Sequence, residues 1–529
     1  MVRKHSSISF LDIESIPVLI KDFLMQKIDG FEKYRFTDNN IENQFQLKSE
    51  KFSLDKRQVL KDVLEKQYSG IQLTENQSTH LDLLLQENTF TVTTGHQLNL
   101  FTGPAFFIYK ILQTIKLAGD LNEKYPDRKT VPVFWMATED HDFEEINHFK
   151  TQNSYYETHA ISGGAVGRIL VEDDFFISEF EKEFKDAVFG TELILLMKKA
   201  YKKGNSLAQA TRILVQELFS EYGLLVIDGD DAAMKSQMKE VFKNELLHQE
   251  LYESTKNTVE FLSETYGKVQ VNPREINLFY LTETRNRIEF NGDNYTIVDT
   301  DITFSKEEIL EELKNYPEKF SPNALMRPVY QETVLPNLAY IGGNAEIMYW
   351  LELKNYYDKI GLPFPVLIPR VSLLFVTEKT MEKAAKLDLK AHHFFKNFAS
   401  VTKEILLQES EILKLLNQEE LSLIKSFDEI ADKAAQTEKS FGSLVNAEKS
   451  RQLKSFERMK KRLLRAEKVK QNEKLQRLEN LFLTIHPDKN WQERVFNFSV
   501  FYGDLGHEWL QSCYEEIDVR KSELIILSI

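Results

Sequence analysis

Residues 93–148 limit the possible folds more than any other part of this 529-residue chain. The stretch begins TTGHQLNLFTGPAFFIYK and ends WMATEDHDFEEINH. Residues 90–93 are typical of a short buried strand, because aromatic and β-branched side chains lead directly into Gly95. Pro104 then stands where the first position of a helix tolerates a missing N–H. Apolar residues follow it at the spacing of one helix face: Ile108, Ile111, Leu112 and Ile115.

A second buried strand is predicted at residues 131–137, VPVFWMA, after this helix. Strand, glycine loop, helix and strand form a βαβ unit, which belongs to a parallel sheet. Ligands of such sheets bind beyond the carboxyl ends of the strands. Both polar clusters of the stretch follow a strand and are therefore expected at that end: Gly95-His96-Gln97 and Glu139-Asp140-His141-Asp142.

The α/β pattern returns twice further along the chain. A helix over residues 207–219 leads into a buried strand at 223–228, GLLVID. Strands are also predicted at 338–341 and 365–368, and a glycine pair turns the chain between them into a helix over 345–360. The N-terminus of that helix is expected to face an anion. The pattern indicates an α/β fold built on a parallel sheet.

Three acids follow the strand at 223–228, and such acids have two interpretations. An acid at a strand end can bind a ribose or a metal ion, and it can also cap the next helix. We interpret Asp230 and Asp231 as helix caps, and we leave the role of Asp228 open.

The composition changes after Arg370. Residues 372–480 contain a single glycine, Gly442, no proline, and many Lys, Glu, Leu and Ala residues. Two long helices that turn back near Gly442 would form an antiparallel coiled-coil arm, and a helical bundle packed on the core is the alternative. We therefore expect four regions: a mainly helical N-terminal region over 1–90, the core over 91–371 with an insertion at about 150–210, a coiled-coil domain over 372–480, and a C-terminal segment over 481–529 that packs back on the core.

Composition narrows the class of function. The formal net charge of −15 argues against a nucleic-acid-binding surface, which needs clustered Lys and Arg. Cys513 is the only cysteine, so no intrachain disulfide can form and a reducing compartment is expected. No stretch approaches the roughly 18 apolar residues that a membrane span needs, and the N-terminus lacks the apolar run of a signal peptide. We expect a cytoplasmic protein that binds neither nucleic acid nor membrane.

The acids and histidines after the second strand allow more than one chemistry. A metal site would use His141, Glu145 and His148, which would share one face of a helix. The sequence contains no HExxH, and an acidic helix start needs no ligand at all. We prefer a third interpretation, in which His141 together with Asp140 and Asp142 positions and deprotonates an amine, or binds the ammonium group of an amino acid. No tightly bound metal is predicted.

The loop after the first strand and two arginines are candidates for ligand binding. Gly95 leaves room for a ligand, and His96 and Gln97 supply hydrogen bonds, with a purely structural histidine as the alternative for His96. Arg327 and Arg370 are placed near strand ends, where a guanidinium suits a carboxylate or phosphate, and a salt bridge is the competing explanation. We assign as catalytic His96, Asp140, His141 and Asp142. We assign to substrate or nucleotide binding Gly95, Gln97, Gly103, Lys110, Trp135, Arg327, Gly342, Gly343, Asn344 and Arg370.

Five segments together resemble one known family. They are TGHQLNLFTGPAFFIYK, VPVFWMATEDHDFEEINH, SPNALMRPVYQETVLPNLAYIGGNAEIMYW, PFPVLIPR and WQERVFN. They are spread over nearly the whole chain in the expected order, and they resemble the cysteine-adding enzymes of bacillithiol biosynthesis, a family described as cysteine ligases. The chain departs from that family at His96, where glutamine is common.

The resemblance implies a fold and an activity. The family has a Rossmann-like core related to nucleotidylyltransferases, with inserted connecting subdomains, and a coiled-coil helical domain through which two copies form a homodimer. Its members are assigned the last step of bacillithiol synthesis, which joins the carboxyl group of cysteine to the amine of glucosaminyl-malate.

That step requires an activated carboxyl group, because a carboxylate does not acylate an amine unaided. We expect ATP, with Mg²⁺, to convert the cysteine carboxyl to an acyl-adenylate or an acyl-phosphate. His96 and the helix after Gly103 are expected to neutralise phosphate charge, while the cluster after the second strand orients the amine. Arg327 and Arg370 would hold the malate carboxylates or the phosphates. A nucleotide-binding coiled-coil scaffold or regulator, and a metal-dependent hydrolase, are the alternatives.

Overall fold

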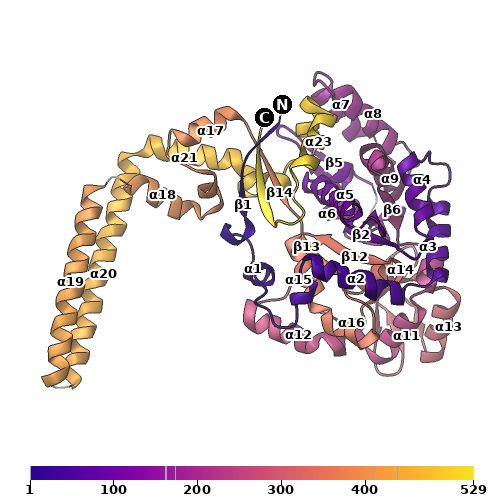
Figure 1. The fold of residues 1–529 in the computed structure, drawn as a ribbon, viewed down its shortest axis with the longest axis horizontal. Coiled ribbons are helices and arrows are strands. Elements are labelled where there is room, and N and C mark those ends of the chain that lie inside the picture. Colours follow the sequence, from indigo (N-terminus) through magenta and orange to yellow (C-terminus); the bar gives the residue numbers. More distant parts are fainter. Residues whose placement is uncertain (1, 161–163, 173, 409, 438) are drawn as a thin grey trace. The chain divides into compact units, whose positions relative to one another are not determined.

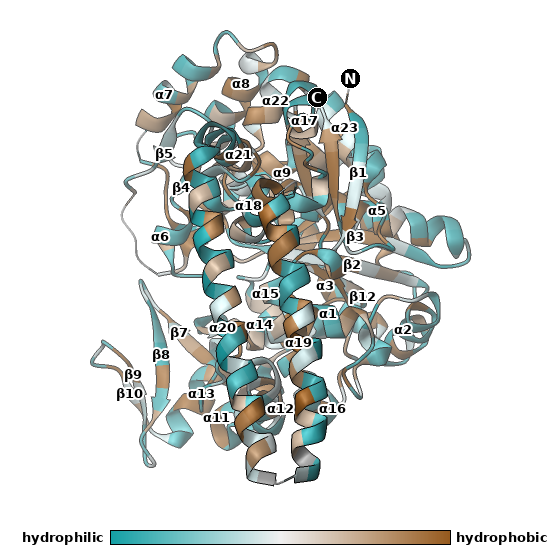
Figure 2. Ribbon diagram, turned by 90° about the vertical axis from the view of Figure 1, so that its left-hand side faces the viewer, coloured by the Kyte–Doolittle hydropathy of each residue, from teal (hydrophilic) through white to brown (hydrophobic). Residues whose placement is uncertain are grey.

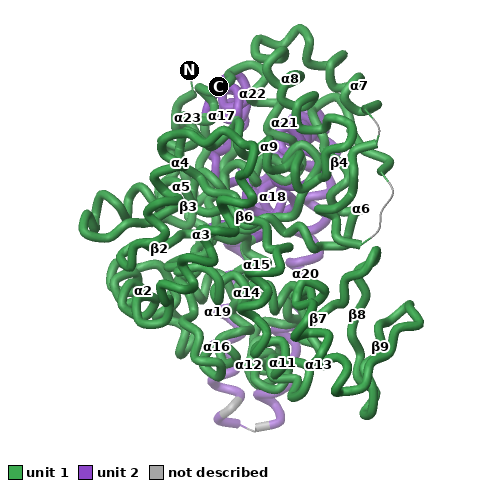
Figure 3. Tube along the Cα trace, turned by 90° about the vertical axis from the view of Figure 1, so that its right-hand side faces the viewer, with its two compact units in different colours: residues 1–11, 16–375, 492–527 green, residues 12–15, 376–491, 528–529 purple. Residues whose placement is uncertain are grey.

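The computed structural model describes residues 2–160, 164–172, 174–408, 410–437 and 439–529 (Figure 1). Contacts divide the chain into two compact units (Figure 3). The first unit contains residues 1–11, 16–375 and 492–527, and the second contains residues 12–15, 376–491 and 528–529. Among the described residues, no helix has both the length and the apolar character that crossing a bilayer requires.

A five-stranded parallel sheet forms the centre of the first unit. Its strands are β2 (Thr89–His96), β3 (Lys129–Met136), β6 (Leu225–Asp228), β12 (Asn337–Gly342) and β13 (Val366–Pro369). Their order is β13-β12-β2-β3-β6, and every neighbouring pair is parallel. The strand order reverses between β2 and β12, which is the arrangement of a Rossmann-like sheet and marks its ligand-binding crevice. All five strands expected from apolar runs are present, because both faces of a parallel sheet are buried.

Helices cover both faces of this sheet (Figure 1). The helices α5 (Phe106–Lys124) and α9 (Leu207–Phe219) lie on one face, against β2, β3 and β6. On the other face lie α2 (Asp38–Lys51) and α15 (Asn344–Glu352), followed by α16 (Lys354–Ile360). The single helix predicted over 345–360 is therefore wrong: α15 closes with a bond from the N–H of Leu353 to the carbonyl of Trp350, and α16 begins afresh.

The remaining helices of the first unit are short or peripheral. They are α1 (Val18–Leu24), α3 (Leu54–Gln67), α4 (Glu75–Leu83), α6 (Phe143–Ile146), α7 (Phe175–Phe184), α8 (Gly190–Ala200), α10 (Ala232–Ser236), α11 (Lys239–His248), α12 (Glu250–Tyr266), α13 (Lys306–Asn315), α14 (Met326–Val334), α22 (Ser499–Leu505) and α23 (His507–Glu516). The predicted insertion holds α7, α8 and the hairpin of β4 (His148–Lys150) and β5 (Tyr155–Glu157). Phe180 of α7 and Met197 of α8 belong to the same buried cluster as the sheet, so this insertion shares the main core.

A second sheet was not predicted, and it is inserted between β6 and β12. Its strands are β7 (Leu278–Leu281), β8 (Arg285–Phe290), β9 (Tyr295–Ile297), β10 (Thr303–Phe304) and β11 (Phe320–Pro322). Their order is β10-β9-β8-β7-β11, and each neighbouring pair is antiparallel. These strands are two to six residues long, and β8 carries charged residues, so the sheet as a whole gives a weaker sequence signal than the buried parallel strands.

The two ends of the chain meet in a three-stranded sheet. Its order is β1 (Arg3–Ser9), β15 (Glu523–Ser528) and β14 (Ser372–Val376), and Figure 1 shows both termini beside it. The N-terminal region is therefore not entirely helical. After β14 the chain leaves the first unit, and it returns at residue 492. Trp509 of α23 is fully buried and packs near Tyr109 of α5, with ring centroids 6.0 Å apart.

The second unit consists of helices. They are α17 (Glu378–Ala385), α18 (Phe398–Leu407), α19 (Glu411–Thr437), α20 (Lys439–Lys470) and α21 (Asn472–Ile485). Figures 1 and 2 show α19 and α20 side by side, with hydrophobic and hydrophilic residues alternating along both. Two ion pairs, Lys449 with Asp428 at 2.5 Å and Lys460 with Glu420 at 2.6 Å, fix their antiparallel register.

The two helices change over close to the predicted position near Gly442, because α19 ends at Thr437 and α20 begins at Lys439. Gly442 itself lies in the first turn of α20. A glycine inside a helix costs only about 1 kcal/mol relative to alanine, so a long helix with many other contacts can hold one.

Glu352, near the C-terminal end of α15, provides a test of this packing. Burial raises the pKa of Glu352 from 4.5 to about 8. A raised pKa means that the folded state prefers the neutral acid, so stability is lost as the pH rises from about 4.5 to about 8. Because one pKa unit corresponds to about 1.4 kcal/mol, we expect Glu352→Gln to stabilise the fold by about 2 to 4 kcal/mol at pH 8.5 and by much less at pH 5. Thermal denaturation at both pH values measures the difference. The exposed Glu311→Gln serves as control, and equal effects of the two variants at both pH values would contradict the assignment.

Candidate functional site

A cavity of about 680 Å³ opens at the carboxyl ends of the parallel strands. One wall combines the loops after β2 and β3 with Tyr340 of β12 and Glu346 of α15. The opposite wall comes from residues 270–287 and 322–330, which include part of the inserted antiparallel sheet. Trp135 lies in the cavity wall and packs edge-on against Tyr330, with ring centroids 5.2 Å apart. The two polar clusters predicted at the strand ends therefore do meet in one cavity.

The point where the strand order reverses is occupied by a buried ion pair. Lys110 of α5 donates to the carboxylate of Glu346 at 2.6 and 2.8 Å and to the carbonyl of Gly95 at 2.5 Å. The hydroxyl of Tyr340 donates to Glu346 at 2.5 Å. Burial raises the pKa of Glu346, but the charge and hydrogen bond of Lys110 outweigh this effect and lower it to about 2. All three protons of Lys110 are used, so this side chain holds the site together and has no proton left for a ligand.

The helix ends predicted to bind anions are occupied by groups of the chain itself. The N–H of Gly343 donates to Glu346 at 3.0 Å, so this carboxylate takes the anion position at the start of α15. Before α5, the N–H of Ala105 donates to the carbonyl of Phe496, and Asn497 donates to the carbonyl of Gly103. Among the described residues, the cavity lining includes neither Gly103 nor the segment 342–344, which contains Gly342 and Asn344.

His96 lies in the cavity wall, but its ring is not positively charged. Burial, together with the charge of Lys110, lowers the pKa of His96 to about 3. The Nε2 atom is buried, and no partner for it is found within the described part of the chain. The rings of Phe106 and Phe107 pack edge-on against the imidazole ring of His96, with centroid distances of 5.2 and 5.3 Å. His96 can therefore form a hydrogen bond with a ligand. Our expectation that His96 neutralises phosphate charge is wrong, because the ring is not a cation.

Hydrogen bonds join the two polar loops. Gln97 donates to Asp140 at 2.8 Å and to Glu145 at 3.0 Å. Asp140 also accepts the backbone N–H of His141 at 2.8 Å. These contacts place the Asp140 carboxylate at the cavity wall. Asp142 is exposed and is not part of the cavity lining as described.

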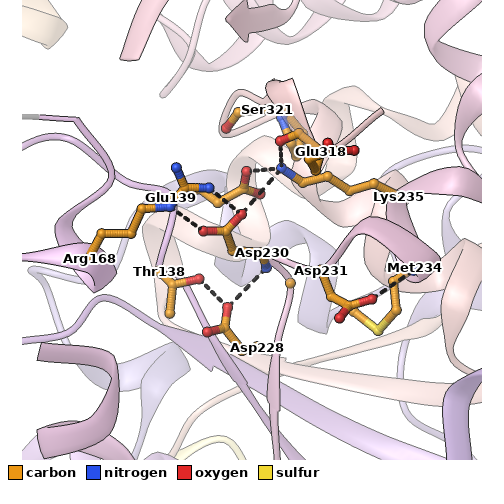
Figure 4. A network of polar contacts seen from close by, with 12 residues as sticks. Thr138, Glu139, Arg168, Asp228, Asp230, Asp231, Met234, Lys235, Glu318 and Ser321 are labelled. Atoms are coloured by element: carbon orange, nitrogen blue, oxygen red, sulfur yellow. Dashed lines mark hydrogen bonds and ion pairs between the residues drawn. The ribbon is translucent and has the colours of Figure 1, made fainter. Parts of the chain in front are cut away.

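A network of charges lies beside the cavity, at the end of β6 (Figure 4). Lys235 forms ion pairs with Glu139 and, at 3.7 Å, with Asp230. Arg168 binds both oxygens of Asp230 at 2.7 and 2.8 Å. Asp228 accepts the hydroxyl of Thr138, and burial raises its pKa. The acids of this network are therefore largely balanced by the cations of the network.

Of the two predicted helix caps, one is confirmed and one is wrong. Asp231 caps α10, because it accepts the N–H groups of Ala233 at 2.8 Å and Met234 at 3.2 Å. Asp230 is not a cap, since its oxygens are engaged by Arg168 and Lys235.

Two arginines of the cavity have no carboxylate partner within the described residues. Arg327 donates to Gln331 at 3.0 Å, and its Nη2 atom is buried without a partner among the residues described. Arg285 donates only to neutral acceptors. Arg274 and Arg287 also line the cavity. Because a partly buried cation without an ion-pair partner is costly, this arrangement is suited to an anionic ligand.

The two arginines predicted as a clamp do not act together. Arg370 forms a buried ion pair with Glu493 at 2.7 Å, with 4% of the residue exposed, and it does not line the cavity as described. The competing explanation, a salt bridge, is confirmed for Arg370. Arg327 does line the cavity, but it lies in the first turn of α14 and not at a strand end.

The metal site that was one alternative interpretation of the acid cluster is not formed. The helix α6 has only four residues, and His148 begins β4, so His141, Glu145 and His148 do not share a helix face. In the part of the chain that the structure describes, no group of three or more metal-ligating side chains could hold an ion.

Sequence reasoning missed the residues that the inserted sheet contributes. Arg285 and Arg287 stand two apart in RNRIEF, a spacing that puts both on one face of a strand. Glu346 follows the glycine pair at the third helical position, where a glutamate is typical of a helix cap. The spacing of the two arginines is visible in the local sequence. The partner of Glu346 is not, because Lys110 lies 236 positions away.

The ion pair at the reversal point predicts a large effect on stability. Lys110→Met or Glu346→Gln leaves the other group buried without its partner, which costs about 3 to 5 kcal/mol. Since the folded pKa of Glu346 is about 2, the contribution of this carboxylate is present above about pH 4.5 and is lost as the pH falls towards 2. Denaturation experiments on both variants and on the double variant measure this coupling. Lys243→Met, which breaks an exposed pair with Glu240, should change stability by less than about 0.5 kcal/mol, and an equally small effect of Lys110→Met would contradict the account.

Comparisons with known proteins agree with the fold. The family model for the N-terminal Rossmann-like domain of bacillithiol biosynthesis BshC matches residues 7–371. The model for the C-terminal coiled-coil domain of the same family matches residues 373–529.

Three relatives match almost the full length. A protein of Flavobacterium johnsoniae is 42% identical and covers 97% of both chains. Proteins of Flavobacterium psychrophilum and Christiangramia forsetii are 40% and 38% identical, and they cover 94% and 98% of both chains. Each of the three carries the name "Putative cysteine ligase BshC". The chain described here belongs to the bacillithiol biosynthesis BshC family.

Proposed function

We propose that this protein is a ligase that joins the carboxyl group of cysteine to the amine of glucosaminyl-malate. Family membership and the name of its relatives support a cysteine ligase. The observation that carries the substrate assignment is the pair of cavity arginines without an ion-pair partner, which share the cavity with the carboxylate of Asp140. A substrate with carboxylates at one end and an amine at the other is complementary to that arrangement.

The malate portion is proposed to bind at the arginines. Arg285 of β8 and Arg327 of α14 come from different elements of the same cavity wall, and neither forms an ion pair within the described residues. Malate bears two carboxylates, and a guanidinium binds each of them with paired N–H groups. Lys110 is excluded from this role because Glu346 and Gly95 use its protons.

The amine is proposed to bind at Asp140. Gln97 and the backbone of His141 hold this carboxylate at the cavity wall. A carboxylate attracts an ammonium group and can accept its proton before the nitrogen attacks. Asp142 takes no part, because it lies outside the cavity lining.

Activation of cysteine is proposed to require ATP with Mg²⁺. These co-substrates supply a good leaving group on the carboxyl carbon. Among the described residues of the cavity, the arginines suit phosphate oxygens, whereas the starts of α5 and α15 are engaged by the chain itself. Positive side chains therefore replace the open helix end that commonly binds phosphate in Rossmann-like folds.

The second unit is proposed to mediate homodimer formation. Several apolar side chains of α19 and α20 are at least 40% exposed: Ile412, Leu415, Leu421, Ile430, Phe441, Leu444 and Met459. A second copy of the helix pair would cover them by coiled-coil packing.

A reconstituted reaction tests the function. Purified protein given ATP, cysteine and glucosaminyl-malate is expected to form bacillithiol, detected by mass spectrometry together with AMP or ADP. Arg327→Met removes a partly buried cation of the cavity wall, and Asp140→Asn removes the proposed amine acceptor, so each should lower kcat/KM by about 100-fold or more.

The control for these variants is Arg477→Gln, an exposed arginine of α21 whose side chain is 72% exposed. It should retain the wild-type rate. Folded Arg327→Met and Asp140→Asn proteins with unchanged kcat/KM would refute the site assignment, and a wild-type protein that forms no product would refute the function.

A further inference from the structure

Arg285 is held by four separate contacts. Its Nε donates to the hydroxyl of Ser321 at 2.9 Å, and its Nη2 donates to the carbonyl of Pro322 at 2.8 Å. The guanidinium carbon lies 3.9 Å from the centre of the Phe279 ring. The remaining nitrogen, Nη1, lies 2.8 Å from Nδ1 of His141. The inserted sheet thus fixes the direction from which Arg285 meets the histidine.

This contact determines where the proton of His141 is located. A guanidinium can only donate hydrogen bonds, so Nδ1 of His141 must be the acceptor. A neutral imidazole that accepts through Nδ1 carries its proton on Nε2. A doubly protonated ring would direct an N–H of its own at the N–H of Arg285, which the geometry opposes.

The charges around His141 act in both directions. Asp140 and Asp142 favour a charged ring, whereas Arg285 and Arg287 oppose it. Burial has the largest effect, followed by Arg285, and the net result lowers the pKa of His141 below its usual value. The ring is therefore neutral at neutral pH.

The Nε2 side of the ring is accessible. His141 lines the cavity, and its side chain is 48% exposed. Within the described residues no hydrogen-bond partner is found for Nε2. A ligand oxygen in the cavity can therefore accept its proton in a hydrogen bond.

We propose that Arg285 is a positioning residue that holds His141 as the neutral Nε2–H tautomer, so that His141 donates a hydrogen bond to a substrate oxygen. This inference rests on the proposed ligase function and revises our expectation that His141 handles the amine. Asp140 is left as the group that takes the proton from the amine.

The assigned tautomer gives His141 a role in the reaction, as a hydrogen-bond donor. The amine nitrogen forms a bond to the activated cysteine carboxyl carbon, and the electron pair of the C=O bond moves to the oxygen. His141 donates its Nε2–H to that oxygen while the negative charge develops. The C=O bond then re-forms and the bond to the phosphate oxygen breaks with its electron pair. The proton that the nitrogen loses on forming the amide passes to Asp140, which has by then released the earlier ammonium proton to solvent.

The tautomer can be measured without any assay of activity. In protein with ¹⁵N-labelled histidine, spectra that correlate ring nitrogens with ring protons distinguish Nε2–H from Nδ1–H. The chain has 11 histidines, and loss of one signal set in His141→Gln identifies His141. We expect an unprotonated Nδ1 and a protonated Nε2 at neutral pH. A protonated Nδ1 in the wild-type protein would overturn the proposal.

The role of Arg285 is tested by Arg285→Met. Without the guanidinium, the ring loses a nearby positive charge, so the pKa of His141 should rise. Nδ1 also loses its hydrogen-bond donor, so both tautomers should appear. An unchanged tautomer and titration would show that Arg285 does not position the ring. If this variant does not fold, the wild-type spectrum still decides the tautomer.

Two substitutions at His141 distinguish a donor from a base. Glutamine can place an N–H near the Nε2 position, whereas leucine cannot, so His141→Gln should retain kcat within about tenfold of the wild type. His141→Leu should lose about 100-fold to 1,000-fold, the usual cost of removing one oxyanion donor. Equal losses in the two variants would overturn the donor role. Absence of product from the wild-type protein, with the Nε2–H tautomer present, would reject the ligase function and leave the tautomer assignment standing.

Discussion

The buried ion pair between Lys110 and Glu346 is the contact on which the rest of the cavity depends. It joins α5 to α15 across the point where the strand order reverses, and it also holds the carbonyl of Gly95 at the end of β2. In sheets of this kind the same crevice usually receives the anionic part of a ligand. Here the carboxylate of Glu346 occupies the start of α15, and Lys110 balances its charge. The energy of this pair stabilises the crevice and leaves ligand recognition to other groups.

Recognition therefore comes from outside the parallel sheet. The inserted antiparallel sheet supplies Arg285 and Arg287, and α14 supplies Arg327. On the opposite wall, the acids are mostly engaged by the chain itself: Glu139 by Lys235 and Asp140 by Gln97. The result is a cavity in which fixed positive charge from the inserted sheet and α14 lies beside the hydrogen-bonding groups of the loops after β2 and β3. Such a division suits a ligand with carboxylates at one end and an amine at the other.

The sequence predicts the parallel sheet well because its strands are buried on both faces. Each apolar run, from residues 90–93 to 365–368, corresponds to a strand, and the polar loops after β2 and β3 do line one cavity. Failures arose where distant segments decide the outcome. Gly103 precedes what the sequence presents as an open helix start, but the N–H of Ala105 donates to the carbonyl of Phe496, far along the chain. Arg370 reads as a ligand clamp, but Glu493 pairs with it inside the core.

The inserted sheet could not be recognised by the same criterion. Its strands are short, β8 is largely charged, and the one apolar run among them, in β7, has only four residues. The role of Arg285 also depends on folding, which brings it to His141, 144 positions away. The choice of the neutral tautomer at His141 follows from that one contact. A local pattern reports residue types and spacing, whereas this property of the site belongs to the tertiary structure.

A crystal structure of the protein with glucosaminyl-malate tests the central claim most directly, because it shows which groups receive each end of the substrate. The account predicts malate carboxylates within hydrogen-bonding distance of Arg285 and Arg327, the amine near Asp140, and the ion pair of Lys110 and Glu346 unchanged. Binding of the substrate outside this cavity, or carboxylates that displace Glu346 from Lys110, would contradict it.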